Sequence, residues 1–136
     1  MLEVFKAKMR NLPKVVKPQF IPQMPSDPTS LPMAEIRTRL FQFTELFRWA
    51  SQVIGSKKAE LKITKTSLDN SIRFAQVERG KITLIEAERQ IKVKYVKVVN
   101  NIAMLEAEIL ALEGLSVGFS AAKEILSREI TVRTSD

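Results

Sequence analysis

The chain has 136 residues and a formal net charge of +7 at pH 7, and it contains neither cysteine nor histidine. This composition excludes disulfide scaffolds, zinc sites built on thiolate or imidazole, and nucleophiles of the Cys or Ser-His type. Charged residues interrupt every apolar run before it reaches the roughly 18 residues of a membrane span. We therefore expect a soluble, basic, mostly helical protein that binds partners away from membranes, is not an enzyme, and needs no metal or cofactor.

Residues 1–32 differ from the rest of the chain because all six prolines lie there, between Pro13 and Pro32. Prolines at this density prevent a helix or a central strand, so we expect an extended arm of polyproline character. The arm has a net charge of +3. Its first twelve residues mix apolar and basic side chains, which leaves two weaker alternatives open: an organelle-import sequence and a small membrane-surface contact.

A helical pattern begins at Met33, after Ser30 and Pro32, which are typical of a helix start. Apolar residues then recur in steps of four and three, as one stripe on a helix: Ile36, Leu40, Phe43, Phe47, Ala50 and Ile54. Gly55 marks either a bend or a tolerated interruption. The helix is expected to end at Arg79-Gly80-Lys81, where a glycine and basic residues suit a C-terminal cap.

A second helix is predicted directly after this turn, because Thr83-Leu84-Ile85-Glu86 has the pattern of a capping box. Its apolar seam follows a heptad: Leu84, Ile91, Tyr95, Val98, Ile102, Leu105, Ile109 and Leu112. A turn and an immediate restart predict an antiparallel helical hairpin. Gly114 and Gly118 are expected to bracket another turn, followed by a shorter helix from Phe119 to about Ile130.

The expected fold class is therefore all-α: a long, coiled-coil-like antiparallel hairpin plus a shorter C-terminal helix, preceded by the extended Pro-rich arm. The expected domains are the basic arm 1–32, a helical domain 33–131 for oligomerisation and nucleic-acid binding, and a frayed tail 132–136. Helices this long cannot bury their apolar surface in a small monomer, so we expect a homo-oligomer. The expected oligomer contacts are Phe43, Phe47, Trp49, Val98, Ile102, Leu105 and Ile109.

Positive charge is concentrated in the arm and the first helix. Residues 33–83 hold ten basic and five acidic side chains, whereas residues 84–136 hold seven and eight. A basic patch at the hairpin tip would attract the phosphates of a polyanion, although a solvated helix face explains the same charges more simply. Few aromatic residues lie nearby, so binding would be mostly electrostatic. The candidate nucleic-acid-binding residues are Lys57, Lys58, Lys62, Lys65, Arg73, Arg79 and Lys81.

The middle of the chain, roughly residues 40–130, resembles the UvsY family of recombination mediators from T-even-type bacteriophages. The resemblance lies in the order and spacing of short motifs. They are Phe47-Arg48-Trp49, Lys57-Lys58-Ala59-Glu60-Leu61, Arg79-Gly80-Lys81, the heptad helix from Leu105-Glu106 to Leu112, Val117-Gly118-Phe119, and Ile125 with Arg128. The chain departs from the family in its basic Pro-rich arm, in the single Arg73 where a Lys-x-Arg pair is expected, and in Val117 in place of arginine.

The resemblance implies an oligomeric, ring-forming protein that binds single-stranded DNA. Such a protein helps a RecA-like recombinase to replace the single-strand-binding protein on DNA, and it would act in the cytoplasm of the phage's host. A different class of function stays open from the residues alone. A structural or assembly protein, such as a virion or adaptor component, would dock its Pro-rich arm along a protein partner.

Overall fold

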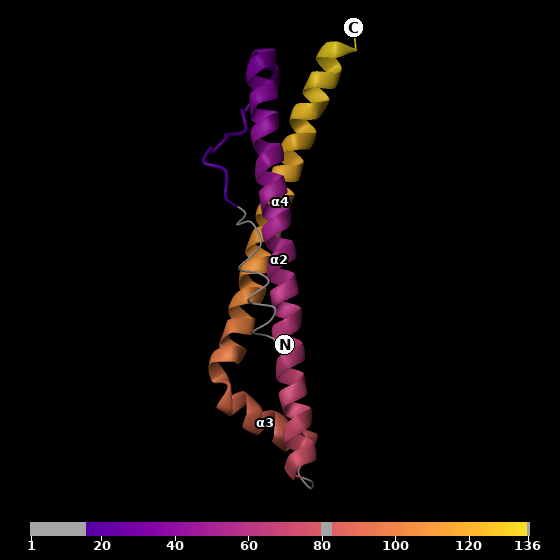
Figure 1. Cartoon of the computed structure of the whole chain (residues 1–136). Helices are drawn as coiled ribbons and strands as arrows, with labels where there is room; N and C mark the ends of the chain where they lie inside the picture. Colours follow the sequence, from indigo (N-terminus) through magenta and orange to yellow (C-terminus); the bar gives the residue numbers. More distant parts are fainter. Residues whose placement is uncertain (1–15, 80–82, 136) are drawn as a thin grey trace. The chain divides into compact units, whose positions relative to one another are not determined.

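The structure is a computed structural model that describes residues 16–79 and 83–135, and throughout these residues it is helical or irregular, with no strand. The elements are a short 3-10 helix η1 (Pro28–Ser30) and the α-helices α2 (Met33–Arg79), α3 (Leu84–Lys94) and α4 (Val96–Thr134) (Figure 1). The predicted all-α class is confirmed. Residues 1–15 of the expected arm and the turn residues Gly80 and Lys81 lie outside the described residues.

The described residues form two compact units. We call residues 55–79 and 83–110 the central unit, and residues 16–54 and 111–135 the terminal unit. Each unit has an apolar core of its own, because α2 and α4 contribute one part of their length to each.

In the central unit, α2 and α3 pack together around one apolar cluster. Leu68, Ile72 and Ala75 of α2 meet Ala87 and Ile91 of α3, and all five are at most 9% exposed. Val99 and Ile102 at the start of α4 pack against the same cluster. Each group lies on one stripe of its helix, as helical periodicity requires for an apolar face.

In the terminal unit, α2 packs against the last part of α4 through Ile36, Phe43, Ala122 and Leu126, which are all buried. The rings of Phe43 and Phe119 lie 6.4 Å apart in a tilted arrangement. That spacing is typical of aromatic pairs in protein cores.

The described part of the arm contacts the helices of the terminal unit. Met24 and Leu31 pack against its apolar cluster. The Arg39 guanidinium donates a hydrogen bond to the Gln23 carbonyl at 2.6 Å, and the Lys17 ammonium lies 5.3 Å from the centre of the Trp49 ring. Residues 16–32 contain no α-helix or strand, as their prolines predict, but η1 adds one turn there.

The predicted turn between Gly114 and Gly118 is wrong, because α4 runs through both glycines without interruption. An isolated glycine destabilises a helix by about 1 kcal/mol relative to alanine. The neighbouring alanine, leucine and glutamate residues favour the helix and offset this cost. Phe119 lies seven residues after Leu112, so the apolar seam keeps its phase through the segment. Gly55 is likewise an interruption that α2 tolerates within its length.

The second predicted helix is instead broken at Tyr95, which ends α3 with φ −112° and ψ 44°. Five β-branched or aromatic residues occur within seven positions there: Val93, Tyr95, Val96, Val98 and Val99. Each loses side-chain freedom in a helix and costs up to about 0.7 kcal/mol relative to alanine. Their combined cost, about 3 kcal/mol, exceeds that of the two glycines, and the break falls among them.

The predicted C-terminal end of α2 and the predicted start of α3 agree with the structure. The last residue of α2 is Arg79, and Thr83 caps α3 by accepting a hydrogen bond from the Glu86 amide at 3.1 Å. The Glu86 carboxylate bonds to Arg89 and Gln90.

At the C-terminus, α4 extends to Thr134, beyond residue 131 where we expected the ordered part to end. The Arg133 side chain explains the extension. It donates hydrogen bonds to Glu129 at 2.8 Å and to the carbonyl oxygens of Pro28 and Thr29 at 3.1 and 3.2 Å.

Candidate nucleic-acid interface

Four of the predicted basic residues of α2 lie along one side of the helix in the central unit, and Lys57 lies outside this side. Lys58, Lys62, Lys65 and Arg73 are all exposed, and we call them the α2 cation stripe. Their positions fall within about 80° of one another around the helix axis at 3.6 residues per turn. The four cations thus share one exposed face of α2, and the buried residues Leu68 and Ile72 lie beside it.

Acidic side chains of α4 neutralise part of this charge. The Lys57 ammonium forms an ion pair with Glu108, and the Lys65 ammonium pairs with Glu106 at 2.9 Å. Both acceptors come from the acidic C-terminal half of the sequence. A polyanion would have to compete with these carboxylates for Lys57 and Lys65, so these two cations are weaker phosphate ligands than the sequence suggests.

Lys62 and Arg73 differ from this pair, because no ion pair involves either of them among the residues that the structure describes. Their Cα atoms are eleven residues apart, which is about three helical turns and roughly 16 Å along one face. Arg73 carries the planar, bidentate guanidinium that suits phosphate oxygens. The Arg79 side chain and Lys81, the two remaining candidates, lie outside the described side chains.

The three basic side chains of α3 each contact another side chain. Arg89 donates two hydrogen bonds to Glu86, at 2.6 and 3.2 Å, and Lys92 pairs with Glu88 at 2.5 Å. The Lys94 ammonium lies 5.4 Å from the centre of the Tyr95 ring. Hydrogen bonds from Arg89, then from Gln90, lower the pKa of the Glu86 carboxyl below its usual value. The hydrogen bond to Glu86 raises the pKa of the Arg89 guanidinium.

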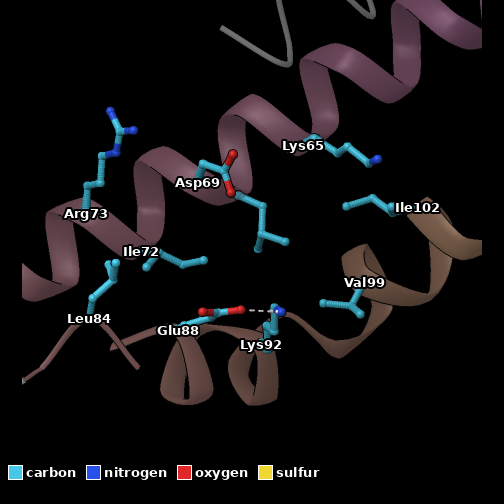
Figure 2. A pocket seen from close by; sticks show the side chains of 10 residues that line it. Lys65, Asp69, Ile72, Arg73, Leu84, Glu88, Lys92, Val99 and Ile102 are labelled. Carbon is cyan, nitrogen blue, oxygen red and sulfur yellow. Dashed lines mark hydrogen bonds and ion pairs between the residues drawn. The ribbon is translucent and has the colours of Figure 1, made fainter. Parts of the chain in front are cut away.

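A groove of about 510 Å³ lies beside the α2 cation stripe, within the central unit (Figure 2). Apolar side chains from all three helices line it: Leu68 and Ile72 from α2, Leu84 from α3, and Val99 and Ile102 from α4. Figure 2 shows the Glu88–Lys92 ion pair of α3 on the wall that faces α2.

The polar lining of the groove has both signs of charge. Lys65, Asp69 and Arg73 contribute from α2, and Glu88 and Lys92 contribute from α3. Sequence reasoning missed Asp69, Glu88 and the five apolar residues as one site. The helical phase of Asp69, four residues after Lys65 and four before Arg73, was the available signal.

The predicted oligomer contacts lie inside or at the edges of the chain's own cores. Phe43, Leu105 and Ile109 are at most 6% exposed, and Ile102 packs against the central cluster. The half-buried Phe47 ring lies 4.7 Å from the Lys123 ammonium, and the half-buried Trp49 lies beneath Lys17. Val98, the last of the seven predicted contacts, is also half-buried.

Large apolar side chains other than the seven residues predicted as oligomer contacts are exposed. Those of the central unit are Phe74, Val77, Leu84, Ile85, Val93, Tyr95, Val96, Met104 and Leu110. Val77 and Ile85 are each 79% exposed. This many exposed apolar residues in one small unit is typical of a surface that another molecule covers.

Within residues 16–79 and 83–135, no group of three or more acidic side chains could hold a metal ion. Over the same ranges, every helix is too polar or too short to cross a lipid bilayer. No protein-family model, curated protein or solved structure matches the chain.

Proposed function

We propose that this protein binds single-stranded DNA as a homo-oligomer and acts as a recombination mediator without catalytic chemistry. The observation that carries the proposal is the exposed pair Lys62 and Arg73 on one face of α2, beside a groove. The residues between Gly55 and Leu110 include eleven basic and seven acidic side chains. The resulting positive field favours a polyanion.

In a homo-oligomer, the weak DNA-binding site of one chain is present several times. The pair Lys62 and Arg73 alone gives low affinity, but several copies present several such pairs to one DNA strand. Because the later contacts are then intramolecular, the overall affinity exceeds that of any single site. The exposed apolar side chains of the central unit, among them Val77 and Ile85, supply surface for this self-association.

The test is charge reversal at the α2 cation stripe. The variant K62E/R73E is compared with K123E/R128E, which makes the same charge change in the terminal unit. We expect K62E/R73E to lose binding to a labelled oligo(dT) at low salt, while its particle mass is unchanged. Equal losses in the two variants, or no binding by the unmodified protein, would contradict the proposal.

The mediator role extends the DNA-binding proposal to two protein partners, a RecA-like recombinase and the single-strand-binding protein. This role rests on the family resemblance and would be exercised in the host cytoplasm by a phage-encoded protein. Its test is recombinase assembly on DNA covered by single-strand-binding protein. The expected result is a shorter lag with the unmodified protein and no shortening with K62E/R73E. An unchanged lag with the unmodified protein would reject the mediator role and leave DNA binding in place.

A further inference from the structure

The groove beside the α2 cation stripe has a composition that a phosphate site alone does not explain. Its lining includes the carboxylates of Asp69 and Glu88, which repel phosphate, and a floor of five aliphatic side chains. A surface that bound only the DNA backbone would gain nothing from either feature. Both features suit a nucleobase, which has an apolar face and a polar edge.

We propose that this groove receives bases of single-stranded DNA and favours bases that carry an exocyclic amino group. The inference rests on the proposed function and specifies which part of the DNA enters the groove. The strand's phosphates would follow Lys62 and Arg73 along α2, and its bases would turn toward the groove between α2 and α3.

The apolar floor would contact the faces of the bases. The accessible part of this lining is Leu84 of α3, which is 52% exposed, with the half-buried Val99 and Ile102 of α4. A volume of about 510 Å³ lies within the range of small-molecule sites. Enzymes that read extruded bases also place them between apolar side chains. Aliphatic contacts distinguish pyrimidines only through the C5-methyl group of thymine, so a preference for cytosine would have to come from the polar lining.

The two carboxylates would read the polar edge of the base. An ionised carboxylate only accepts hydrogen bonds, and it pairs with the N4 amino group of cytosine. Glu88 already accepts from Lys92, but a carboxylate has about four acceptor positions, so further acceptance is available. Thymine has the O4 acceptor at the corresponding position and would meet like polarity.

The experiment compares three fluorescent oligonucleotides of equal length with the full-length protein at one salt concentration. They are oligo(dC), oligo(dT) and a strand of abasic sites. We expect oligo(dC) to bind about three- to tenfold more tightly than oligo(dT), the ratio typical of one added hydrogen bond. The abasic strand should bind most weakly, because it keeps the phosphates and lacks the bases.

Two matched variants assign the preference to the groove. In D69N/E88Q, amide side chains of the same shape both donate and accept, so the ratio between oligo(dC) and oligo(dT) should fall to about one. In E60Q/E78Q, which makes the same charge change outside the groove, the ratio should persist. Removing acidic charge strengthens binding to every strand, but it leaves this ratio unaffected unless the removed groups contact the base.

The possible failures are distinguishable. If all three strands bind equally, or if oligo(dT) binds more tightly than oligo(dC), the base-binding groove is rejected and DNA binding stands. A preference for oligo(dC) that survives in D69N/E88Q also rejects it. If no strand binds at low salt, the proposed function fails and the inference fails with it.

Discussion

Lys65 of α2 and Glu106 of α4 form an ion pair of 2.9 Å, on the face that the sequence predicts for DNA phosphates. About two turns earlier in α2, Lys57 pairs with Glu108. Carboxylates of α4 thus neutralise lysines of α2 within the central unit. Fewer cations are available to a polyanion than the number of lysines in the sequence implies.

Removing the acidic partners of these two ion pairs is expected to strengthen DNA binding. In E106Q/E108Q, Lys57 and Lys65 lose their partners, and each gains a contact with phosphate of about 1 kcal/mol at most. Affinity for oligo(dT) at low salt should rise by up to about thirtyfold, while stability changes by less than about 1 kcal/mol per pair. Fluorescence anisotropy measures the affinity. The control E35Q/E124Q makes the same charge change in the terminal unit, and an equal gain there would count against a localised site.

The continuity of α4 predicts that G118A stabilises the protein. An ideal Cβ at Gly118 has no heavy atom within 4 Å beyond the helix's own neighbourhood, and alanine is about 1 kcal/mol better than glycine in a helix. Urea unfolding should therefore show a gain of about 1 kcal/mol. A121G, an exposed site on the same helix, should lose a similar amount. Destabilisation by G118A would indicate a turn at this position.

The hydrogen bonds of Glu86 give α3 a defined dependence on pH. Because the pKa of the folded carboxyl lies below 4.5, the ionised form stabilises the fold fully above that value, and this stabilisation is lost as pH falls through the lower pKa. A carboxyl-carbon NMR titration should give a Glu86 midpoint below 4.5. The variant R89Q should move the midpoint upward, since Arg89 is its principal partner. A midpoint that R89Q leaves unchanged would show that this hydrogen bond does not set the pKa.

The contact between the arm and α2 can be followed through Trp49, the single tryptophan of the chain. The Lys17 ammonium lies over its ring, a contact of about 0.5–1 kcal/mol at an exposed site. K17A should therefore increase the quenching of Trp49 fluorescence by acrylamide. K94A removes a cation from Tyr95 in the central unit and should have no such effect. Unchanged quenching in K17A would mean that Lys17 does not cover the ring in solution.

Deleting residues 1–32 separates the two classes of function raised by the sequence. A DNA-binding protein that uses the α2 cation stripe should keep its affinity for oligo(dT) within about twofold, because Lys62 and Arg73 lie outside the arm. Loss of assembly with a protein partner, together with no DNA binding in either form, would favour the structural class.

The sequence predicted the helices where a strong local signal exists. The apolar stripe from Ile36 to Ile54, the end of α2 at Arg79 and the cap at Thr83 all agree with the structure. The errors at Gly114 and Tyr95 share one cause, because the glycines were given more weight than a dense run of β-branched residues. Counting the cost of each residue across the segment would have placed the break correctly.

The site was less predictable because it depends on contacts between helices. Helical phase placed Lys62, Lys65 and Arg73 on one face, but phase cannot show that Glu106 reaches Lys65. The groove needs the packing of α3 against α2, which a break at Tyr95 positions. Burial of Phe43, Leu105 and Ile109 within the chain's own cores likewise follows from tertiary packing and not from periodicity.

The most direct test of the central claim is the salt dependence of binding to single-stranded DNA. For single strands, the slope of log K against log salt concentration changes by about 0.7 for each phosphate neutralised. K62Q/R73Q replaces two cations. Its slope should therefore be shallower by about 1.4 for each copy of the chain that contacts the strand. The control K123Q/R128Q should keep the original slope. A slope that is the same in K62Q/R73Q and the unmodified protein would contradict the claim that this face of α2 holds the DNA backbone.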